Sequence, residues 1–445
     1  MATPCLTADL SRWIDSFAEM LDRRIAWRLR PLLTGLLFAT GRRTVSSWLR
    51  AGHLSKDYQE YYYFLTSVGH NIKSLALAVL FVALRVVAPA GRILLAIDDT
   101  PSKRYGPKVE GAGIHRNPTP GPAGAKFVYG HVWVTLAWVV RHPLWQAIGL
   151  PLLARLYVRQ KDITAQALPV LRRIRFQTKL AMGAELVTWA AKWLKIRGRS
   201  VWVVADGAYA KRVFLKAAAA AGVTVVSRLR KDAALWDVPA PPKRRGRGRP
   251  RKYGKKAISL ARRAGQRRGW QVEPFVLYGV ERVRHYKNFL ATYRPAGGLI
   301  RVILVQEDSE GWRAYFCTDA QVTVREILEA VADRSALEQV FHDIKEVHGV
   351  GQAQTRNYWA HVGVYHMNLW LHTLIELWAW SRPAKELIDR RLSPWDDDER
   401  RPSHADRRNA LRRKCLEEEY QAGAAQGAVP LKIQRLWSRV LRLVA

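Results

Sequence analysis

One stretch near the middle of the chain limits the fold more than any other, because two apolar segments flank a segment typical of a helix. Residues 200–230 read SVWVVADGAYAKRVFLKAAAAAGVTVVSRLR. We expect a strand that runs to Asp206, a helix over about 211–221 and a strand over 223–229. A strand–helix–strand unit of this length joins two parallel strands of one sheet. The sequence therefore predicts an α/β protein.

Two adjacent carboxylates follow another apolar segment, in the stretch RILLAIDDT at residues 92–100. The run 93–97 predicts a strand buried on both faces, with Asp98 and Asp99 at its end. Asp206 closes VWVVAD in the same way. Ligands of α/β sheets bind at the carboxyl ends of the strands, and a bound cation offsets the cost of buried carboxylates. We expect a shared site there, although each aspartate alone also suits an ordinary turn or helix cap.

A predicted helix farther along the chain supplies a third carboxylate. Residues 332–349, ADRSALEQVFHDIKEVHG, carry an apolar stripe that would pack on a sheet, made of Leu337, Val340, Phe341, Ile344 and Val347. A polar stripe beside it contains Arg334, Glu338, His342 and Lys345. Glu338 lies where the stripes meet, so we expect it to be half-buried and to point at the strand ends. The alternative is a solvated amphipathic helix with ion pairs.

Carboxylate oxygens from these three places would suit hard divalent cations. Mg²⁺ prefers oxygen ligands, and two such ions can assist phosphodiester displacement by a water or a 3′-hydroxyl. We therefore predict that Asp98 or Asp99, together with Asp206 and Glu338, binds two Mg²⁺ (or Mn²⁺) ions.

The order of these motifs resembles the DDE-type transposases of bacterial insertion sequences. LLAIDDT is similar to their first-strand motif, and residues 200–230 are similar to the unit around their second aspartate. One large cut-and-paste group has the signature Tyr, two residues, Arg, three residues, Glu, six residues, Lys. Here Arg334, SAL, Glu338, QVFHDI and Lys345 match that spacing, whereas Val331 stands at the tyrosine position.

The resemblance implies an RNase H-like fold and a transposase that cuts DNA at the ends of an insertion sequence and transfers the strand into target DNA. It implies catalytic and metal-binding roles for Asp98, Asp99, Asp206 and Glu338, of which one of the first two is the ligand; between these we favour Asp99. Arg334 and Lys345 would hold phosphates. A homodimer on double-stranded DNA is also implied. The alternatives are a catalytically silent, domesticated DNA-binding protein and an RNase H-like nuclease without strand transfer.

The charge of the chain favours a nucleic-acid partner. Lys and Arg number 73 against 37 Asp and Glu, which gives a formal net charge of +36. Residues 243–256, KRRGRGRPRKYGKK, contain an AT-hook-like Arg-Gly-Arg-Pro, or else a basic linker that binds phosphates without preference. A second basic segment begins at Gly41 and contains Arg42 and Arg43. It reads as a turn that leads into a short helix, which suits a helix-turn-helix or an ordinary helical hairpin. The candidate DNA contacts of the two segments are Arg42, Arg43, Arg247, Arg249, Arg251 and Lys252.

The predicted fold is an RNase H-like mixed-sheet core with an inserted β-rich basic segment and helical N- and C-terminal regions. We divide it into five parts: a helical DNA-binding domain (1–90), the first part of the core (91–231), the basic, β-rich insertion (232–320), the core helix with Glu338 and its successors (321–382), and a charged linker with a last helix (383–445). We expect one long helix from Thr323 through residue 349.

Other sequence features narrow the setting. The three cysteines form no Cys-x-x-Cys pair. The scattered histidines His115, His131, His342 and His348 show no zinc-binding spacing, so we expect each of these four to be structural. No Gly-Lys-Thr phosphate loop is present, which argues against a nucleotide cofactor. The apolar run 75–84 meets Arg85 well short of a membrane span. We expect a cytoplasmic bacterial protein without a membrane partner, associated with the nucleoid when it is bound to DNA.

Overall fold

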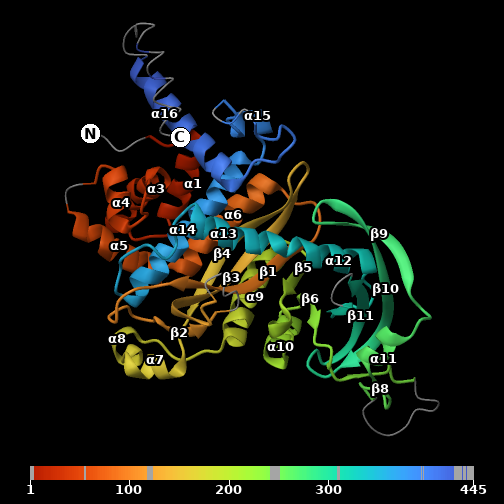
Figure 1. Ribbon diagram of the computed structural model, residues 1–445. Coiled ribbons are helices and arrows are strands. Elements are labelled where there is room, and N and C mark those ends of the chain that lie inside the picture. The colour runs from red at the N-terminus through yellow and green to blue at the C-terminus, as the bar shows by residue number, and fades with distance from the viewer. Residues whose placement is uncertain are drawn as a thin grey trace.

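A single mixed sheet runs through the molecule, with helices on both of its faces and at both ends of the chain (Figure 1). The computed structural model describes residues 5–54, 57–117, 124–240, 251–307, 311–391, 393, 395–424, 433 and 437. The AT-hook-like arginines Arg247 and Arg249 lie outside the described residues. The predicted α/β class with helical ends is confirmed.

The core of the sheet has the strand order β4-β3-β1-β5-β6. Strand β1 (Ile93–Lys103) pairs antiparallel with β3 (Phe127–His142), which pairs antiparallel with β4 (Gln146–Tyr157) and with the short β2 (Gly113–Arg116). On its other side β1 pairs parallel with β5 (Val201–Ala205), and β5 pairs parallel with β6 (Thr224–Leu229). Helix α10 (Arg212–Ala220) connects β5 to β6, so the predicted crossover unit is present.

Strand β1 is longer than the sequence predicts. Asp98 and Asp99 do not close it, because the strand continues to Lys103 against the long partner β3. The parallel pairing with β5 does end there, at Ile97 opposite Ala205. The two carboxylates therefore lie just beyond the last residue of β1 that pairs with β5. At their position β1 pairs with β3 along one edge, and its other edge is not paired with β5.

The β-rich segment extends the same sheet beyond β6. Strand β12 pairs antiparallel with β6, and β11, β10, β7 and β8 follow outward, with β9 pairing to β10. These strands curve away at the end of the sheet that is opposite the N-terminal helices (Figure 1). Their bounds, with that of the short helix beside them, are β7 (Leu235–Trp236), β8 (Ala257–Ile258), α11 (Leu260–Gly265), β9 (Gln271–Leu277), β10 (Val280–Tyr293), β11 (Gly298–Glu307) and β12 (Gly311–Cys317).

Helices pack on the two faces of the core sheet. The segment after β4 forms α7 (Gln160–Ala165), α8 (Leu168–Arg172) and α9 (Lys179–Ile196), of which α9 contacts β3, β4 and β5. The segment predicted as one long helix is two helices, α12 (Val324–Asp333) and α13 (Ser335–Glu346), which meet at Arg334. The break has a packing reason, because α12 contacts β6, β9 and β12 whereas α13 contacts β1, β3 and β4.

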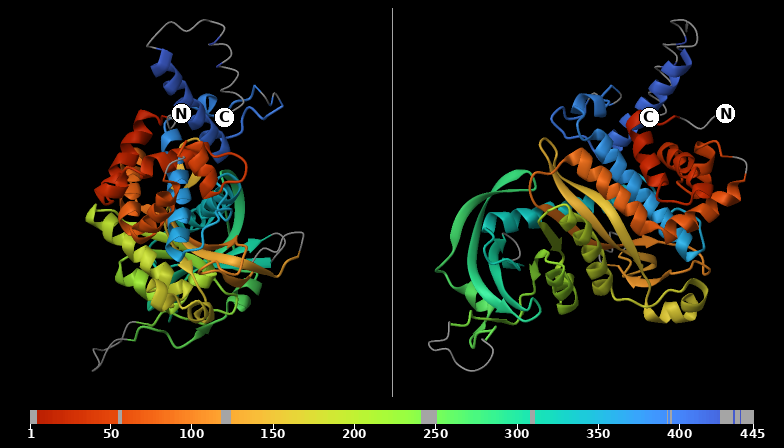
Figure 2. Two further views of the ribbon diagram at one scale, coloured as in Figure 1. Left: turned by 90° about the vertical axis from the view of Figure 1, so that its left-hand side faces the viewer. Right: turned by 180° about the vertical axis from the view of Figure 1, so that it is seen from behind.

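The N-terminal helices and the C-terminal helices form one helical layer. The first six are α1 (Ala8–Ala18), α2 (Arg23–Ala26), α3 (Leu29–Phe38), α4 (Val45–Ala51), α5 (Tyr58–His70) and α6 (Ile72–Val87). The last three are α14 (Tyr358–Ala379), α15 (Ala384–Leu387) and α16 (His404–Ala424). Figure 2 shows α14 lying against α5 and α6. Nearly every residue of α14 is buried.

Helices α5 and α14 cross with their backbones almost in contact. A Cβ atom added to Gly69 would lie 2.0 Å from the carbonyl oxygen of Trp359, and one added to Gly363 would lie 2.0 Å from the carbonyl oxygen of Leu65. Only glycine permits so close an approach. The two glycines therefore attach the N-terminal helices to the rest of the protein.

Within the described residues, no single helix has both the length and the apolar composition needed to cross a membrane, and the pair α5–α6, which has them jointly, is bent by 77°.

Candidate active site

The adjacent aspartates of β1 point to opposite faces of the sheet, as alternation along a strand requires. Asp98 faces α13, where its Oδ2 accepts a hydrogen bond of 2.6 Å from Nη1 of Arg334. Asp99 faces α9, where its Oδ2 accepts a 2.6 Å hydrogen bond from Nζ of Lys179. Each carboxylate thus has its own cationic partner, supplied by a different helix.

Arg334 connects Asp98 to the third predicted carboxylate. Its Nη2 lies 2.7 Å from Oε1 of Glu338, one turn later in the sequence. The guanidinium therefore lies between a carboxylate of β1 and a carboxylate of α13. The expectation that Glu338 is half-buried is wrong, because its side chain is 58% exposed, whereas that of Asp98 is 22% exposed.

Asp206 follows β5 directly and begins a single turn of 3-10 helix, η1 (Gly207–Tyr209). Its Oδ2 accepts a 3.2 Å hydrogen bond from the backbone N–H of Ala208. Aspartate is a common N-cap residue, and this hydrogen bond caps the turn. The side chain is half-buried. The same residue can therefore cap the turn and offer its remaining carboxylate oxygen to a ligand.

A buried tyrosine, Tyr209, lies near enough to the three aspartates for their charges to act on it. Burial raises the pKa of the Tyr209 phenol, and the negative charges of Asp99, Asp98 and Asp206 raise it further. The ring packs against α9 at Gly183, where an added Cβ would lie 2.8 Å from Cε1 of the ring. Tyr209 therefore lies on the α9 side of the sheet, which is the side that Asp99 faces.

Burial also changes the acidity of Asp98. It raises the pKa of this carboxyl to about 6, although the charge of Arg334 and a hydrogen bond from the backbone N–H of Asp99 act in the opposite direction. The charges of Asp99 and Asp206 add to the rise. A carboxyl group with so high a pKa, beside other carboxylates at a sheet edge, is typical of a functional site.

The sequence also matches a known protein family. A family model described as DDE superfamily endonuclease matches residues 16–273. The chain belongs to the DDE superfamily endonucleases. The matched span of this endonuclease includes Asp98, Asp99 and Asp206 and ends before Glu338.

One solved structure is similar to the endonuclease along most of its chain. A solved chain from the "Cryo-EM structure of piggyBac transposase synaptic complex with hairpin DNA" is similar to it with a TM-score of 0.39 and 8% sequence identity, over 98% of this chain and 76% of that chain. No curated protein matches its sequence.

The residues of the endonuclease that were predicted to bind phosphate or DNA differ in position and in exposure. Lys345 donates a 2.6 Å hydrogen bond from Nζ to Oγ1 of Thr100, so it lies beside the carboxylates on the face of β1 that carries Asp98. Arg42 is exposed in the turn before α4, whereas Arg43 is half-buried and its backbone N–H donates to Oε1 of Gln352. Two more of the predicted DNA contacts, Arg251 and Lys252, are exposed.

Two residues of the site were not predicted. Tyr209 stands three residues after Asp206 within the analysed stretch, and Lys179 is the first residue of α9. Alternation along the strand places Asp99 on the face opposite Asp98, which indicates that Asp99 has a partner of its own. Which residue becomes that partner depends on how α9 packs. Neither residue is recognisable from its own sequence neighbourhood.

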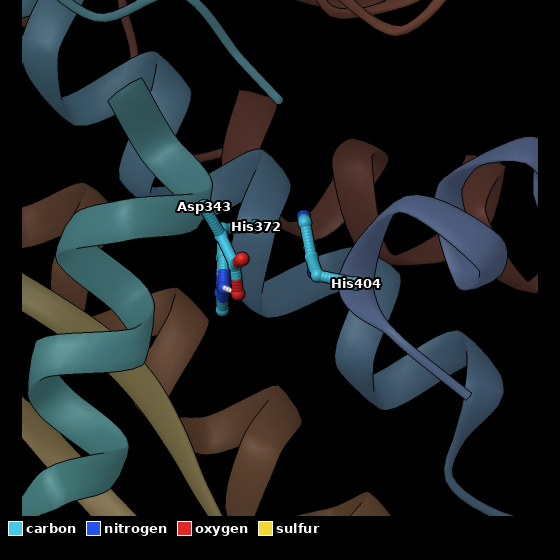
Figure 3. Close-up of side chains that lie close together, drawn as sticks. All are labelled: Asp343, His372 and His404. Carbon is cyan, nitrogen blue, oxygen red and sulfur yellow. Dashed lines mark ion pairs between the residues drawn. The ribbon is translucent and has the colours of Figure 1, made fainter. Parts of the chain in front are cut away.

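The described residues also contain a group whose side chains meet the geometric requirement for a metal ion, and it is not the set of predicted carboxylates. Asp343, His372 and His404 each offer a ligand atom, and these atoms lie within 4.8 Å of one another (Figure 3). At the predicted site Arg334 lies between Asp98 and Glu338 instead. In the endonuclease the guanidinium therefore partly neutralises these carboxylates.

Proposed function

We propose that the protein is a transposase that cleaves DNA at the ends of an insertion sequence and joins the freed 3′-hydroxyl to target DNA. The observation that carries the proposal is that Arg334 bridges Asp98 of β1 and Glu338 of α13, while the charge of Asp206 reaches the Asp98 carboxyl and Lys345 contacts Thr100 beside it. Membership of the DDE superfamily endonucleases supports the cleavage reaction. Strand transfer and the insertion-sequence substrate rest on the resemblance in sequence.

The donor atoms fit a hard divalent cation. All three side chains offer carboxylate oxygens, the ligands that Mg²⁺ and Mn²⁺ prefer. Two such ions, when bound, would lower the pKa of the attacking water or hydroxyl and stabilise the leaving oxygen. We assign Asp98 rather than Asp99 as the ligand from β1, because Asp98 shares a face with Arg334 and Glu338 whereas Asp99 is paired with Lys179.

The cationic residues of the site would bind the phosphodiester. Arg334 has a planar fork of donors that suits two phosphate oxygens, and Lys345 adds a point charge beside Thr100. When a cation joins the carboxylates, the Arg334 guanidinium is free to turn toward the phosphate. The exposed Arg42, Arg251 and Lys252, with the half-buried Arg43, extend the contact to flanking DNA. The resemblance to transposases implies that two ends are processed together by a homodimer on the DNA.

The direct test is a nicking assay with full-length protein, Mg²⁺ and DNA that spans the end of the element. Asp98→Asn, Asp206→Asn and Glu338→Gln are each expected to lose at least about 100-fold in nicking rate, because each removes a charged ligand, while DNA binding stays within about threefold. Glu346→Gln is the matched control, since Glu346 is an exposed glutamate of the same helix. It should cut like wild type.

Each other outcome decides among the alternatives. Normal nicking by Asp206→Asn or Glu338→Gln would show that the site is assigned wrongly. Binding without any nicking by the wild type would identify a silent DNA-binding protein. Nicking without joined products, when target DNA is supplied, would identify a nuclease that lacks strand transfer.

A further inference from the structure

Three buried side chains from three helices meet at a point that the proposed reaction does not use. Asp343 comes from α13, His372 from α14 and His404 from the first residue of α16. They are 6%, 2% and 3% exposed. Figure 3 shows Asp343 and His372 side by side, with His404 facing them across the space between the helices.

The spacing within this cluster suits a shared ligand. The candidate ligand atoms all lie within 4.8 Å of one another, and Nε2 of His372 lies 3.6 Å from Oδ2 of Asp343, too far for a hydrogen bond. The rings of His372 and His404 stack with their centroids 3.9 Å apart. Two nitrogen ligands of one tetrahedral ion lie about 3.4 Å apart. The two rings must therefore turn out of their stacked arrangement to direct their lone pairs to a common ion.

An unsatisfied histidine gives independent evidence for a missing partner. Both ring nitrogens of His372 are buried and have no hydrogen-bond partner. Buried polar atoms are almost always paired, so an imidazole with neither nitrogen paired calls for an unseen ligand. A cation bound to one nitrogen would satisfy that atom and pair with the charge of Asp343.

The surroundings of His404 orient it as a ligand. Its Nδ1 lies 2.6 Å from Oε1 of Glu376, and the other oxygen of Glu376 accepts a 2.6 Å hydrogen bond from Nη1 of Arg407. A carboxylate that holds one imidazole nitrogen fixes the ring and directs the lone pair of the other nitrogen to a metal. That other nitrogen, Nε2, forms a 2.7 Å hydrogen bond with Nε2 of His348. A bound ion would replace this hydrogen bond and would leave the His348 imidazole beside it as a further nitrogen donor.

We propose that Asp343, His372 and His404 bind one transition-metal ion, with Zn²⁺ as the metal that this set of two nitrogens and one oxygen fits best. Mg²⁺ prefers oxygen ligands alone, whereas imidazole suits Zn²⁺. The fourth position is open to water or to His348.

The position of the site gives it a role distinct from catalysis. Asp343 lies five residues after Glu338 on the same helix, and both line one cavity of about 700 Å³ that also reaches His372 and His404. The ion reaches its ligands through this cavity. Once bound, it ties α16 and α14 to the helix that presents Glu338, and thereby holds that helix against the sheet.

The test uses full-length protein that has been stripped with a chelator and then titrated with Zn²⁺ or Co²⁺. The wild type is expected to retain one equivalent of Zn²⁺ after dialysis and to melt several degrees higher with Zn²⁺ than without it. His372→Gln is expected to bind Zn²⁺ at least tenfold more weakly and to lose the thermal shift. Asp206→Asn should keep both, which separates this site from the proposed catalytic one.

A buried histidine outside the cluster provides the matched control. His366 lies on the same helix as His372, and its two nitrogens already have partners in the backbone groups of Ala154 and Val362. His366→Gln should lower the melting temperature but keep the Zn²⁺ equivalent. Visible absorption bands of bound Co²⁺ with nitrogen ligands provide a second readout on the wild type alone. A wild type that retains no Zn²⁺ equivalent, or that binds Co²⁺ only with the spectrum of a hydrated ion, would overturn the proposal.

Discussion

The guanidinium of Arg334 lies 2.6 Å from the carboxylate of Asp98, although the two residues are far apart in sequence. The same guanidinium contacts Glu338 at 2.7 Å. A positive charge at this point holds the carboxylates together in the absence of a metal ion, and it competes with any cation that would take its place.

The first prediction concerns this competition. Arg334→Gln removes the competing charge, so the protein alone should bind Mn²⁺ more tightly, by roughly tenfold or more for charges a few ångströms apart. Nicking should nevertheless fall, because the phosphate loses its forked donor. Titration of Mn²⁺ by paramagnetic resonance measures the affinity. Weaker Mn²⁺ binding by the variant would show that Arg334 helps to build the metal site rather than competing for it.

The second prediction concerns the pH dependence of cleavage. Burial raises the pKa of Asp98 to about 6. The protonated carboxyl cannot bind the cation, so metal-dependent nicking should fall about tenfold between pH 7 and pH 5, as the ionised fraction falls. The rate of nicking is measured at saturating DNA, with DNA binding followed separately over the same range. A rate that is flat between pH 5 and pH 7 would contradict the role given to Asp98.

The third prediction concerns stability. A carboxyl whose pKa is higher in the folded than in the unfolded protein lowers the free energy of unfolding when it ionises. This loss is absent below the unfolded-state pKa, grows as the pH rises between the two pKa values, and is complete above the folded-state pKa. Asp98→Asn should therefore increase the free energy of unfolding at pH 8 by roughly 1–3 kcal/mol, a gain that disappears near pH 4.

Asp99→Asn is the control for this stability effect. It removes a carboxylate that is paired with Lys179, so it should give no gain at pH 8. Denaturant unfolding at both pH values measures the difference. If the two variants behave alike, the burial of Asp98 is not the cause.

The fourth prediction concerns the crossing of α5 and α14. Gly363→Ala forces a methyl group against the carbonyl oxygen of Leu65, so it should destabilise the protein by about 3 kcal/mol or more. Gly298→Ala is the control, because an added Cβ meets nothing within 4 Å there. Thermal unfolding compares the two. Equal stabilities would mean that the helices separate easily and that the N-terminal helices form an independent unit.

Much of the core could be predicted because its signals are local. The apolar runs before Asp98 and Asp206 and the alanine-rich helix between β5 and β6 determine strands and helix from their own residues. The spacing of Arg334, Glu338 and Lys345 predicted one helix face, since side chains four and seven positions apart share a face. In the structure Arg334 and Lys345 contact β1, and Glu338 contacts Arg334.

The differences arise where packing decides. The extension of β1 past Asp99 depends on the length of β3, and the break at Arg334 depends on α12 and α13 packing against different strands. Lys179 and Tyr209 join the site only through the placement of α9 and η1. The cluster of Asp343, His372 and His404 comes from three separate helices, so no spacing along the chain predicts it.

The most direct test of the account asks whether Glu338, the carboxylate outside the matched family span, is a metal ligand. Glu338→Cys replaces an oxygen donor by a sulfur donor, which Mg²⁺ binds poorly and the softer Mn²⁺ tolerates better. Nicking of end-containing DNA is measured for this variant and for Asp206→Cys, in Mg²⁺ and in Mn²⁺. The account predicts that both variants are inactive in Mg²⁺ and recover activity in Mn²⁺. Full activity of Glu338→Cys in Mg²⁺, or recovery by Asp206→Cys alone, would contradict it.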